Sequence, residues 1–482
     1  MNEITFQNKT ASLTTADRLV YDTVRKSLTF AVPGAKYSPL YKAGRWDGKK
    51  CFLTGPGWTF PAGLVPHVQT ALAKKKFVVP VRDIRDHSNT APAPPDAVIE
   101  KSLIGTVLRD YQIAAVQAIF ERTRGIIQAP TGSGKTKIVV AAMNWAIRTK
   151  GSKTLLLTHK QELLYQTEKS LRESTGIEAA IFGDGESPLM KPANIGMVQT
   201  LAGRLKKNDP AVLHLLNNVD MLIIDEAHHG DAESFQAVCN ACNAFYRIGL
   251  TATPMMKGEI EDMQLMAVTG GVIFRITLQE LIDRGLLAQP FVKFVRVSET
   301  QAAMKRSMTW QSAYRDGVVE NPHRNALIIA ETADLVRKGC QVLVLVNEIR
   351  HGEILQKTFI DGGFRSTYIH GKKDIETRQK ALVDIQNGNL DILVSSTITD
   401  EGVDIPALSA IVLAGGWMSQ IRHFQRIGRG MRPKEAGKEN RVFIVDFADL
   451  TNRYLAKHSL ARIRIIRDEP AFRLVGTFDP FF

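Results

Sequence analysis

The stretch Ala129-Pro130-Thr131-Gly132-Ser133-Gly134-Lys135-Thr136 decides the fold of this chain. A short apolar run at 125–128 precedes it and predicts a buried strand that ends in a tight loop. Residues 137–147 follow with apolar side chains at helical spacing and without Gly or Pro. A strand, a glycine loop and a helix in this order are what a phosphate-binding loop (P-loop) requires.

The residue types in this loop have chemical reasons. Gly132 and Gly134 let the backbone turn its N–H groups around phosphate oxygens, and the helix N-terminus adds partial positive charge. Lys135 is predicted to reach the β- and γ-phosphates of ATP, and the Thr136 hydroxyl to bind Mg²⁺. The other predicted nucleotide-binding residues of the loop are Pro130, Thr131 and Ser133. The alternative is a plain Gly/Ser turn with a chance lysine, which the flanking strand and helix disfavour.

Composition points to a globular protein with a polyanionic partner. The chain has 482 residues, which predicts two or three domains, and its hydrophobic content is 44%. The formal net charge is +13. Residues 1–90 contain 14 Lys and Arg against 6 Asp and Glu, so the positive charge is concentrated there. Such an excess favours nucleic acid, although charge alone speaks of non-specific binding.

Cysteine usage and hydropathy bound the location. Four cysteines are too few for a disulfide framework, which favours a reducing compartment. Cys239 and Cys242 form a lone C-x-x-C, for which two buried helix cysteines are favoured over a metal site. The N-terminus lacks the features of a signal peptide, and no apolar run reaches the ~18 residues of a membrane span. We therefore expect a soluble, cytoplasmic protein without a membrane partner.

The chain is predicted to fold as two parallel α/β domains behind a small α+β domain. The boundaries that we expect are an accessory domain at 1–88, a Pro-rich linker at 89–98, α/β domains at 99–288 and 289–450, and a basic tail at 451–482 that forms one helix. Apolar runs without alternation favour strands that are covered on both faces. The expected strands are 126–128, 154–157, 179–182, 195–198, 221–224, 247–250, 342–346, 367–369, 392–394, 411–413 and 442–445.

Acidic and amide side chains extend the predicted nucleotide site. Asp225 and Glu226 follow an apolar strand, where a carboxylate can hold Mg²⁺ and a second one can act as general base on the attacking water. An acidic helix N-cap is the alternative. His228 is a candidate link between this site and motion elsewhere. Before the loop, Gln112 can meet the adenine edge, and Tyr111 can stack or pack.

A second group of motifs lies in the second α/β half. Arg429 and Arg432 are three residues apart, so on a helix they share a face and can clamp a γ-phosphate. A basic helix that contacts nucleic acid is the alternative. Gly402 permits close backbone approach, and Asp404 can accept a hydrogen bond from a ribose hydroxyl.

Candidate nucleic-acid contacts are spread over the chain. Lys160, Gln199, Thr200 and Thr397 offer donors that position a strand without reading its sequence. Residues 41–50, Tyr-Lys-Ala-Gly-Arg-Trp-Asp-Gly-Lys-Lys, interleave aromatic and basic side chains, which suits Arg45 and Trp46 to DNA contact. A solvated turn around a small core is an equally weighted alternative for that segment.

The motifs PTGSGKT, DEAH, TAT, TDEGVDIP and QRIGRGMR, in this order, resemble those of superfamily 2 helicases over residues 105–450. That resemblance implies two RecA-like domains, ATP between them and nucleic acid across both. It assigns the ATPase roles to Gln112, Lys135, Thr136, Asp225, Glu226, Arg429 and Arg432. DEAH in place of DEAD and TAT in place of SAT make the DEAD-box RNA class less favoured. The segments GRWDG at 44–48 and PAGLV at 61–65 look like the N-terminal domain of phage UvsW-type helicases, which are similar in function to the RecG class.

The resemblance implies an ATP-dependent DNA helicase that remodels branched DNA by fork regression, Holliday-junction branch migration and D-loop or R-loop unwinding. A monomer is expected. RNA as the substrate is one alternative, and the translocating subunit of a restriction complex is a second. The third alternative is an ATP-gated clamp that binds nucleic acid without unwinding it.

Overall fold

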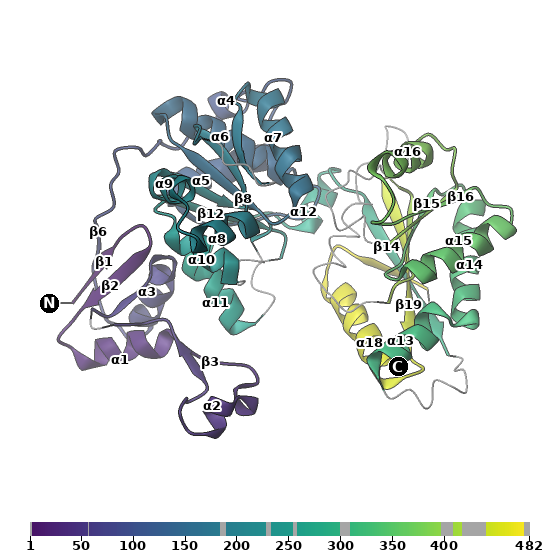
Figure 1. Ribbon diagram of the computed structural model, residues 1–482, viewed down its shortest axis with the longest axis horizontal. Coiled ribbons are helices and arrows are strands. Elements are labelled where there is room, and N and C mark those ends of the chain that lie inside the picture. Colours follow the sequence, from purple (N-terminus) through teal and green to yellow (C-terminus); the bar gives the residue numbers. More distant parts are fainter. Residues whose placement is uncertain are drawn as a thin grey trace. The chain divides into compact units, whose positions relative to one another are not determined.

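The computed structural model describes residues 2–55, 57–183, 189–227, 233–253, 258–298, 309–396, 408–416 and 440–476. The chain divides into two compact units, one with residues 1–130 and 134–276 and the other with 131–133 and 277–482. The first unit contains the accessory domain and the first α/β domain, and the second contains the second α/β domain (Figure 1). None of the helices among the described residues combines the length and the apolar character that crossing a bilayer requires.

A small α+β domain forms the N-terminal part of the first unit. Its elements are β1 (Glu3–Phe6), β2 (Thr10–Thr14), α1 (Arg18–Ser27), β3 (Thr29–Ala31), η1 (Ala35–Tyr37), α2 (Pro39–Lys42), β4 (Lys49–Cys51), β5 (Thr59–Pro61), η2 (Ala62–Leu64), α3 (Val65–Lys74) and β6 (Val81–Asp83). The described sheet has the order β5-β2-β1-β6, with β6 parallel to β1 and the other pairs antiparallel. Asp17 caps α1 by accepting from the backbone N–H of Leu19, and Val20 and Val24 share the buried face of that helix. Strands β3 and β4 form a separate ribbon that carries α2 away from this core (Figure 1).

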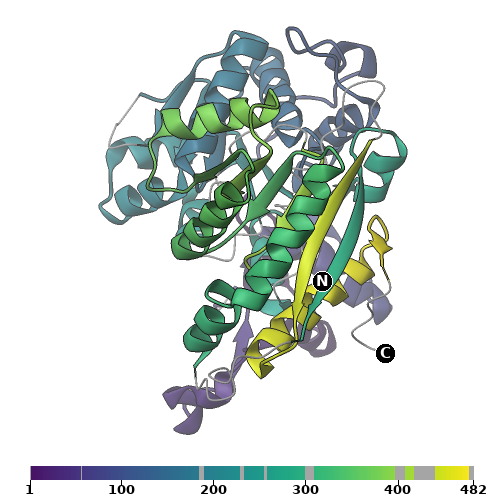
Figure 2. The ribbon, with the colours of Figure 1, turned by 90° about the vertical axis from the view of Figure 1, so that its right-hand side faces the viewer.

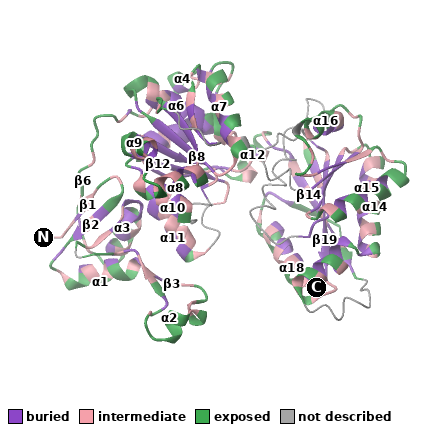
Figure 3. Cartoon of the chain, in the orientation of Figure 1, coloured by how far each residue is buried: buried purple, intermediate pink, exposed green. Residues whose placement is uncertain are grey.

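The first α/β domain is built on a parallel sheet. Its elements are α4 (Asp96–Ile99), α5 (Asp110–Arg122), β7 (Arg124–Gln128), α6 (Lys135–Lys150), β8 (Thr154–Thr158), α7 (Gln161–Thr175), β9 (Ala179–Phe182), β10 (Ala193–Met197), α8 (Val198–Lys206), α9 (Pro210–Asn218), β11 (Met221–Ile224), α10 (Glu233–Ala241), β12 (Tyr246–Thr251), α11 (Glu259–Val268) and β13 (Val272–Arg275). Its seven described strands run in the order β13-β7-β12-β11-β8-β10-β9, all parallel. Every residue of β8 and β11 is buried, because helices cover both faces of the sheet (Figure 3).

The second α/β domain repeats the same principle. Its elements are α12 (Leu278–Asp283), β14 (Gln289–Val297), α13 (Trp310–Tyr314), the π-helical turn η5 (Arg315–Val319), α14 (Pro322–Arg337), β15 (Val342–Leu345), α15 (Ile349–Asp361), β16 (Ser366–Ile369), α16 (Ile375–Gln386), β17 (Ile392–Ser395), β18 (Ala410–Leu413), β19 (Arg441–Asp449), α18 (Arg453–Asp468) and β20 (Arg473–Val475). The order of its described strands is β16-β17-β15-β18-β19-β14-β20, again all parallel. Strand β14 pairs with β19 over its whole length, and the two lie side by side in Figure 2. The predicted fold class, two RecA-like domains behind a small α+β domain, is confirmed.

Three described strands of the two α/β domains were missed by the sequence pattern, although every expected strand segment overlaps an observed one. Strand β13 is short, and its side chains are only partly buried or exposed. Pro290 and the charged Lys293 and Arg296 interrupt the apolar pattern of β14, which is held by its pairing with β19. The residues of β20 are exposed, so burial leaves no signal in its sequence.

The helix expected in the C-terminal tail is present as α18, but one of its basic residues is buried and paired with an aspartate. Arg462 is buried, and its Nε donates to Asp446 Oδ2 at 2.9 Å. In the same domain Arg324 is buried too, with Nε donating to Asp449 Oδ1 at 2.6 Å and Nη1 to Ala414 O at 2.7 Å. Breaking such a pair from one side leaves an uncompensated buried charge, so both pairs fix the packing of this domain.

A buried histidine lies beside this network. His351 on α15 has no exposed surface, and its Nε2 lies 2.9 Å from Asn325 Oδ1. Burial and the neighbouring Arg324 guanidinium lower the pKa of His351 from its ordinary 6.5 to about 3. The ring is therefore neutral in the folded protein, and its Nε2–H donates to Asn325.

We predict that this histidine makes folding depend on pH. Below pH 6.5 the unfolded chain binds a proton at His351 that the native protein does not, so stability falls by up to about 1.4 kcal/mol per pH unit as the pH decreases toward 3. Melting temperatures between pH 5 and pH 8 should decrease less steeply toward acid in His351→Gln than in the unchanged protein. The exposed His214→Gln is the control and should keep the original slope. Equal slopes in all three proteins would contradict the neutral, buried state of His351.

Candidate functional site

The glycine loop joins β7 to α6 at the carboxyl end of the first sheet. Gly132 and Gly134 have φ angles of +87° and +81°, in the left-handed region that L side chains rarely adopt. The Ala129 N–H donates to Thr251 O at 3.0 Å, which ties the start of the loop to the end of β12. Lys135 Nζ donates to Ala129 O at 3.2 Å, so the ammonium group lies over the same loop. This backbone is suited to wrap around an anion at the start of a long helix.

Gln112 lies against this loop from the first turn of α5. Its Oε1 accepts from Arg109 N at 3.0 Å, which holds the amide in place. A methyl group on Gly134 would lie only 2.5 Å from Gln112 Nε2, so the loop packs directly on the amide. Tyr111 is buried, and its hydroxyl accepts from Arg109 Nη1 at 3.2 Å, which favours packing over stacking. Adenine recognition by Gln112 and nucleotide contact by Tyr111 stay predictions.

Asp225 and Glu226 follow β11 in a tight turn. Asp225 Oδ1 accepts from Glu226 N at 2.9 Å. Glu226 has a φ of +48°, an uncommon conformation for a residue other than glycine. On the neighbouring strand, a methyl group on Gly249 would lie 2.9 Å from Ala227 Cβ, so only glycine lets this turn pack so closely on β12. The turn is thus held by the sheet itself, and such backbone strain is typical of functional sites.

The strand order brings these two loops to the same edge, with one strand between them. Strand β12 pairs with β7 on one side and with β11 on the other. The Thr251-Ala252-Thr253 segment ends β12, so it lies between the glycine loop and the acidic turn. Thr253 N donates to Thr251 Oγ1 at 3.2 Å, whereas Thr253 Oγ1 and Gln128 Oε1 are buried without a hydrogen-bond partner among the described residues. Sequence reasoning used this segment only as the TAT motif and named no site residue in it, although its place at a strand end was a signal for one.

The residues at this edge fit a nucleoside triphosphate with its cation. Glycine backbone, a helix N-terminus and Lys135 suit phosphate oxygens. The Thr136 hydroxyl and the Asp225 carboxylate are the oxygen donors that Mg²⁺ prefers. The buried, unpartnered oxygen atoms of Gln128 and Thr253 are further groups that a ligand or its water could satisfy.

Three predicted nucleic-acid contacts also lie at this edge of the first domain. Lys160 is the N-cap of α7 directly after β8, and Gln199 and Thr200 start α8 directly after β10. Strands β8 and β10 are parallel neighbours, so these residues share one side of the sheet. Arg45 and Trp46 lie far from them in the sequence, on the β3–β4 ribbon. The residues that lie outside the described part of the chain are His228, Thr397, Gly402, Asp404, Arg429 and Arg432.

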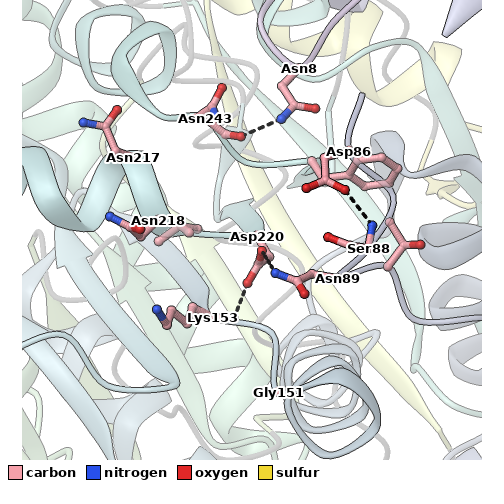
Figure 4. Close-up of a pocket in the computed structure, with 13 residues that line it drawn as sticks. Asn8, Asp86, Ser88, Asn89, Gly151, Lys153, Asn217, Asn218, Asp220 and Asn243 are labelled. Atoms are coloured by element: carbon pink, nitrogen blue, oxygen red, sulfur yellow. Dashed lines mark hydrogen bonds between the residues drawn. The ribbon is translucent and has the colours of Figure 1, made fainter. Parts of the chain in front are cut away.

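A polar pocket of about 270 Å³ lies at the opposite, amino-terminal end of the strands. It is lined by Asn8 of the accessory domain, by the linker and by Lys153 and Asp220, which precede β8 and β11 (Figure 4). Asp220 accepts from Asn89 Nδ2 at 3.2 Å and from Lys153 N at 2.7 Å. These contacts hold the linker on the first α/β domain, away from the glycine loop.

Both cysteines of the C-x-x-C pair are buried, as expected. Only Cys239 lies on a helix, since Cys242 follows the end of α10. Burial raises the pKa of the Cys239 thiol to about 12. Arg247 is buried beside the pair and donates to Cys239 O at 3.0 Å and to Cys242 O, so it satisfies the carbonyls at the end of α10. No cluster of His, Cys, Asp or Glu able to hold a metal occurs among the residues that the structure describes.

Three known protein families match parts of this chain. The family described as type III restriction enzyme, res subunit, matches residues 105–256, and the helicase conserved C-terminal domain matches 324–434. The family described as DNA helicase UvsW, N-terminal, matches residues 3–81. The chain is a superfamily 2 helicase that is similar to the UvsW type. It is therefore an ATP-dependent DNA helicase, with the glycine loop and acidic turn inside the first matched motor region.

Individual relatives agree with this placement of the helicase. The ATP-dependent DNA helicase uvsW of Enterobacteria phage T4 is 22% identical over 486 residues, which cover 92% of this chain and 93% of the relative. Putative helicase 22 of a Sulfolobus islandicus filamentous virus is 24% identical and covers 75% of this chain and 67% of its own. Among solved structures, a fragment of a putative HsdR subunit of a type I restriction enzyme from Vibrio vulnificus has a TM-score of 0.54 at 18% identity. It covers 85% of this chain and 74% of that one, and it supports the fold alone.

We predict that Gly134→Ala weakens ATP binding. The substitution adds about 1–2 kcal/mol of backbone strain in the left-handed region and drives a methyl group into the Gln112 amide. The KM for ATP should therefore rise, and calorimetric nucleotide binding should weaken. Gly151→Ala, at the other end of α6, has a similar φ of +64° but open space around it, so it is the matched control. An equal change of KM in both variants would show that strain alone, without the Gln112 contact, is responsible.

Proposed function

We propose that this helicase remodels branched DNA by fork regression, Holliday-junction branch migration and D-loop or R-loop unwinding. The observation that carries the proposal is the β3–β4 ribbon of the accessory domain. The match of the UvsW N-terminal family to residues 3–81 supports it. A motor alone needs no such appendage to move along a strand, whereas a branched substrate has an additional duplex arm to be held.

The ribbon presents aromatic and basic groups together. Tyr37 and Tyr41 are 71% and 42% exposed, and Lys36 Nζ lies 5.2 Å from the centre of the Tyr37 ring. Trp46 Nε1 donates to Lys49 O at 2.8 Å, which fixes the indole within the ribbon. The residues around α2 are largely exposed (Figure 3). Exposed rings stack on bases and basic groups bind phosphates, so the ribbon suits DNA without reading its sequence.

The nucleotide site supplies the energy for this movement. Lys135 binds the β- and γ-phosphates, while Thr136 and Asp225 would hold Mg²⁺. When bound, Mg²⁺ neutralises charge on the phosphate oxygens. Glu226 accepts the proton of the attacking water as general base, from a backbone position that β11 and Gly249 restrain. Arg429 and Arg432 as γ-phosphate ligands, and Gly402 and Asp404 as nucleotide contacts, rest on the sequence alone.

The general-base assignment predicts a separation of ATP binding from hydrolysis. Glu226→Gln keeps the size of the side chain but removes the proton acceptor, so kcat for ATP should fall by about 10²–10⁴. Nucleotide binding, measured with a fluorescent ATP analogue, should change little. Glu233→Gln is the control, because Glu233 is an exposed residue at the start of α10. Normal hydrolysis by Glu226→Gln would assign the base to another residue.

The branched-DNA proposal is tested by a panel of substrates. We expect the unchanged protein to unwind forked and four-way DNA and to be stimulated by DNA more than by RNA. The ribbon variant, Arg45→Ala with Trp46→Ala, removes one charge and one ring. It should weaken junction binding and junction unwinding about tenfold, since base stacking on an aromatic side chain contributes about 1–3 kcal/mol. ATPase stimulated by single-stranded DNA should stay nearly constant. Lys101→Ala removes an exposed charge elsewhere and is the control.

Three outcomes would contradict the proposal. Stimulation by RNA alone would favour an RNA helicase, and robust ATPase without strand displacement would favour a clamp. Translocation that is productive only with stoichiometric partner subunits would favour a restriction motor, the class named in the description of the family that matches residues 105–256.

A further inference from the structure

Helix α11 belongs to two hydrophobic cores within the first unit. Ile260, Met263 and Ala267 lie in the core of the accessory domain, together with Ile4 and Phe60. Leu265 and Val268 of the same helix lie in the core of the first α/β domain. A helix whose side chains enter two cores cannot shift in one core without disturbing the other, because protein interiors are close-packed. The accessory domain and the first α/β domain are thus joined by a common packed element.

Gly63 is the point at which the accessory domain touches this helix most closely. The η2 turn places Gly63 so near the end of α11 that a methyl group would collide with Met266 O and lie 2.8 Å from Ala267 O. Gly63 lies outside the positive-φ region, so its backbone itself accepts any residue. The glycine is therefore required by space, which explains its place in the Pro61-Ala62-Gly63-Leu64-Val65 segment.

Arg85 forms a second joint between the same two domains. Its guanidinium carbon lies 4.5 Å from the ring centre of Phe6 in β1 and 4.0 Å from that of Phe245, the residue before β12. Its Nη1 also donates to Thr123 Oγ1 at 3.1 Å, and only 6% of its side chain is exposed. A buried guanidinium between two rings is held by cation–π attraction and by its hydrogen bonds.

The linker between the accessory domain and the first α/β domain is itself held by hydrogen bonds. Tyr246 Oη donates to Ala91 O at 2.9 Å, and Trp145 Nε1 donates to Pro92 O at 2.8 Å. Next to the linker, Asn8 Nδ2 of the accessory domain donates to Asn243 O at 2.9 Å (Figure 4). The Pro-rich segment therefore runs along the first α/β domain as a bonded strap.

Helix α11 is also close in the chain to the proposed nucleotide site. It begins at Glu259, shortly after the end of β12 at Thr251, whose carbonyl oxygen accepts from the glycine loop at Ala129. The glycine loop is therefore hydrogen-bonded to the strand that α11 follows in the chain.

We propose that α11, seated on Gly63 and braced by Arg85, is a rigid coupling joint that delivers ATP-driven movement of the first α/β domain to the DNA arm held by the accessory domain. This rests on the proposed function, in which the ribbon binds that arm. Gly63 and Arg85 are positioning residues, because they touch neither nucleotide nor DNA in this scheme. The joint determines how many base pairs are opened per ATP, whereas affinity for the junction belongs to the ribbon.

The test uses the full chain with the joint loosened at both places. Gly63→Ala with Arg85→Ala should raise hydrogen exchange in α11 and η2, while junction binding and single-strand-stimulated ATPase stay within about twofold. Base pairs opened per ATP on four-way DNA should fall about tenfold, because a misplaced arm is no longer moved with the motor. The matched control is Gly57→Ala with Arg82→Ala, since Gly57 has ordinary space around it and Arg82 is exposed.

Two results would overturn the joint. Unchanged base-pair opening per ATP despite faster exchange in α11 would show that the joint transmits nothing. Unchanged exchange in α11 would show that these contacts do not hold the domain. If the accessory domain unfolds in the double variant, Arg85→Ala alone is measured, with the same two criteria.

The ribbon variant of Arg45 and Trp46 separates this inference from the proposed function. If the ribbon variant binds junctions weakly but the joint variant opens a normal number of base pairs per ATP, only the coupling role of α11 is rejected. If the ribbon variant binds junctions normally, the proposed DNA-binding role of the ribbon is rejected, and so is the coupling role of α11 that rests on it.

Discussion

The position of β12 between β7 and β11 is the constraint on which the proposed nucleotide site depends. Parallel strands lie about 4.8 Å apart, so this order sets the glycine loop and the acidic turn about 10 Å apart at one edge of the sheet. The hydrogen bond from Ala129 N to Thr251 O joins β12 to the first loop, and Gly249 lets the second turn pack against it. The positions of Lys135 and Glu226 in the fold are thus fixed relative to each other although they are 91 positions apart in the chain.

Buried arginine side chains stabilise both α/β domains. Arg247 satisfies the carbonyls at the end of α10, and Arg324 and Arg462 each meet an aspartate inside the second α/β domain. Removal of one partner from any of these contacts would leave a buried polar or charged group without compensation, so the contacts stabilise the observed packing. His351 belongs to the same region and stays neutral because burial, and after it the nearby Arg324 charge, lower its pKa.

The accessory domain is more than a tethered module. Its core includes side chains of α11, and its guanidinium bridge at Arg85 uses rings from both domains. In the proposed function, a flexible tether would let a bound DNA arm move relative to the motor, whereas a shared core would keep the arm in a fixed position relative to it. The ribbon that carries Arg45 and Trp46 therefore extends from a firm base.

Local sequence was sufficient for the fold class, for most strands of the two α/β domains and for the strand, loop and helix around residues 129–136, because these depend on residue type and on spacing along the chain. Buried parallel strands such as β8 and β11 carry that signal in every residue. It was insufficient for β14, whose charged residues are tolerated through pairing with β19, and for Arg462, whose charge is cancelled by Asp446. The requirement for glycine at 63, the double packing of α11 and the place of Thr253 between two loops were decided by tertiary structure alone, since each depends on atoms that meet only when segments distant in the sequence come together.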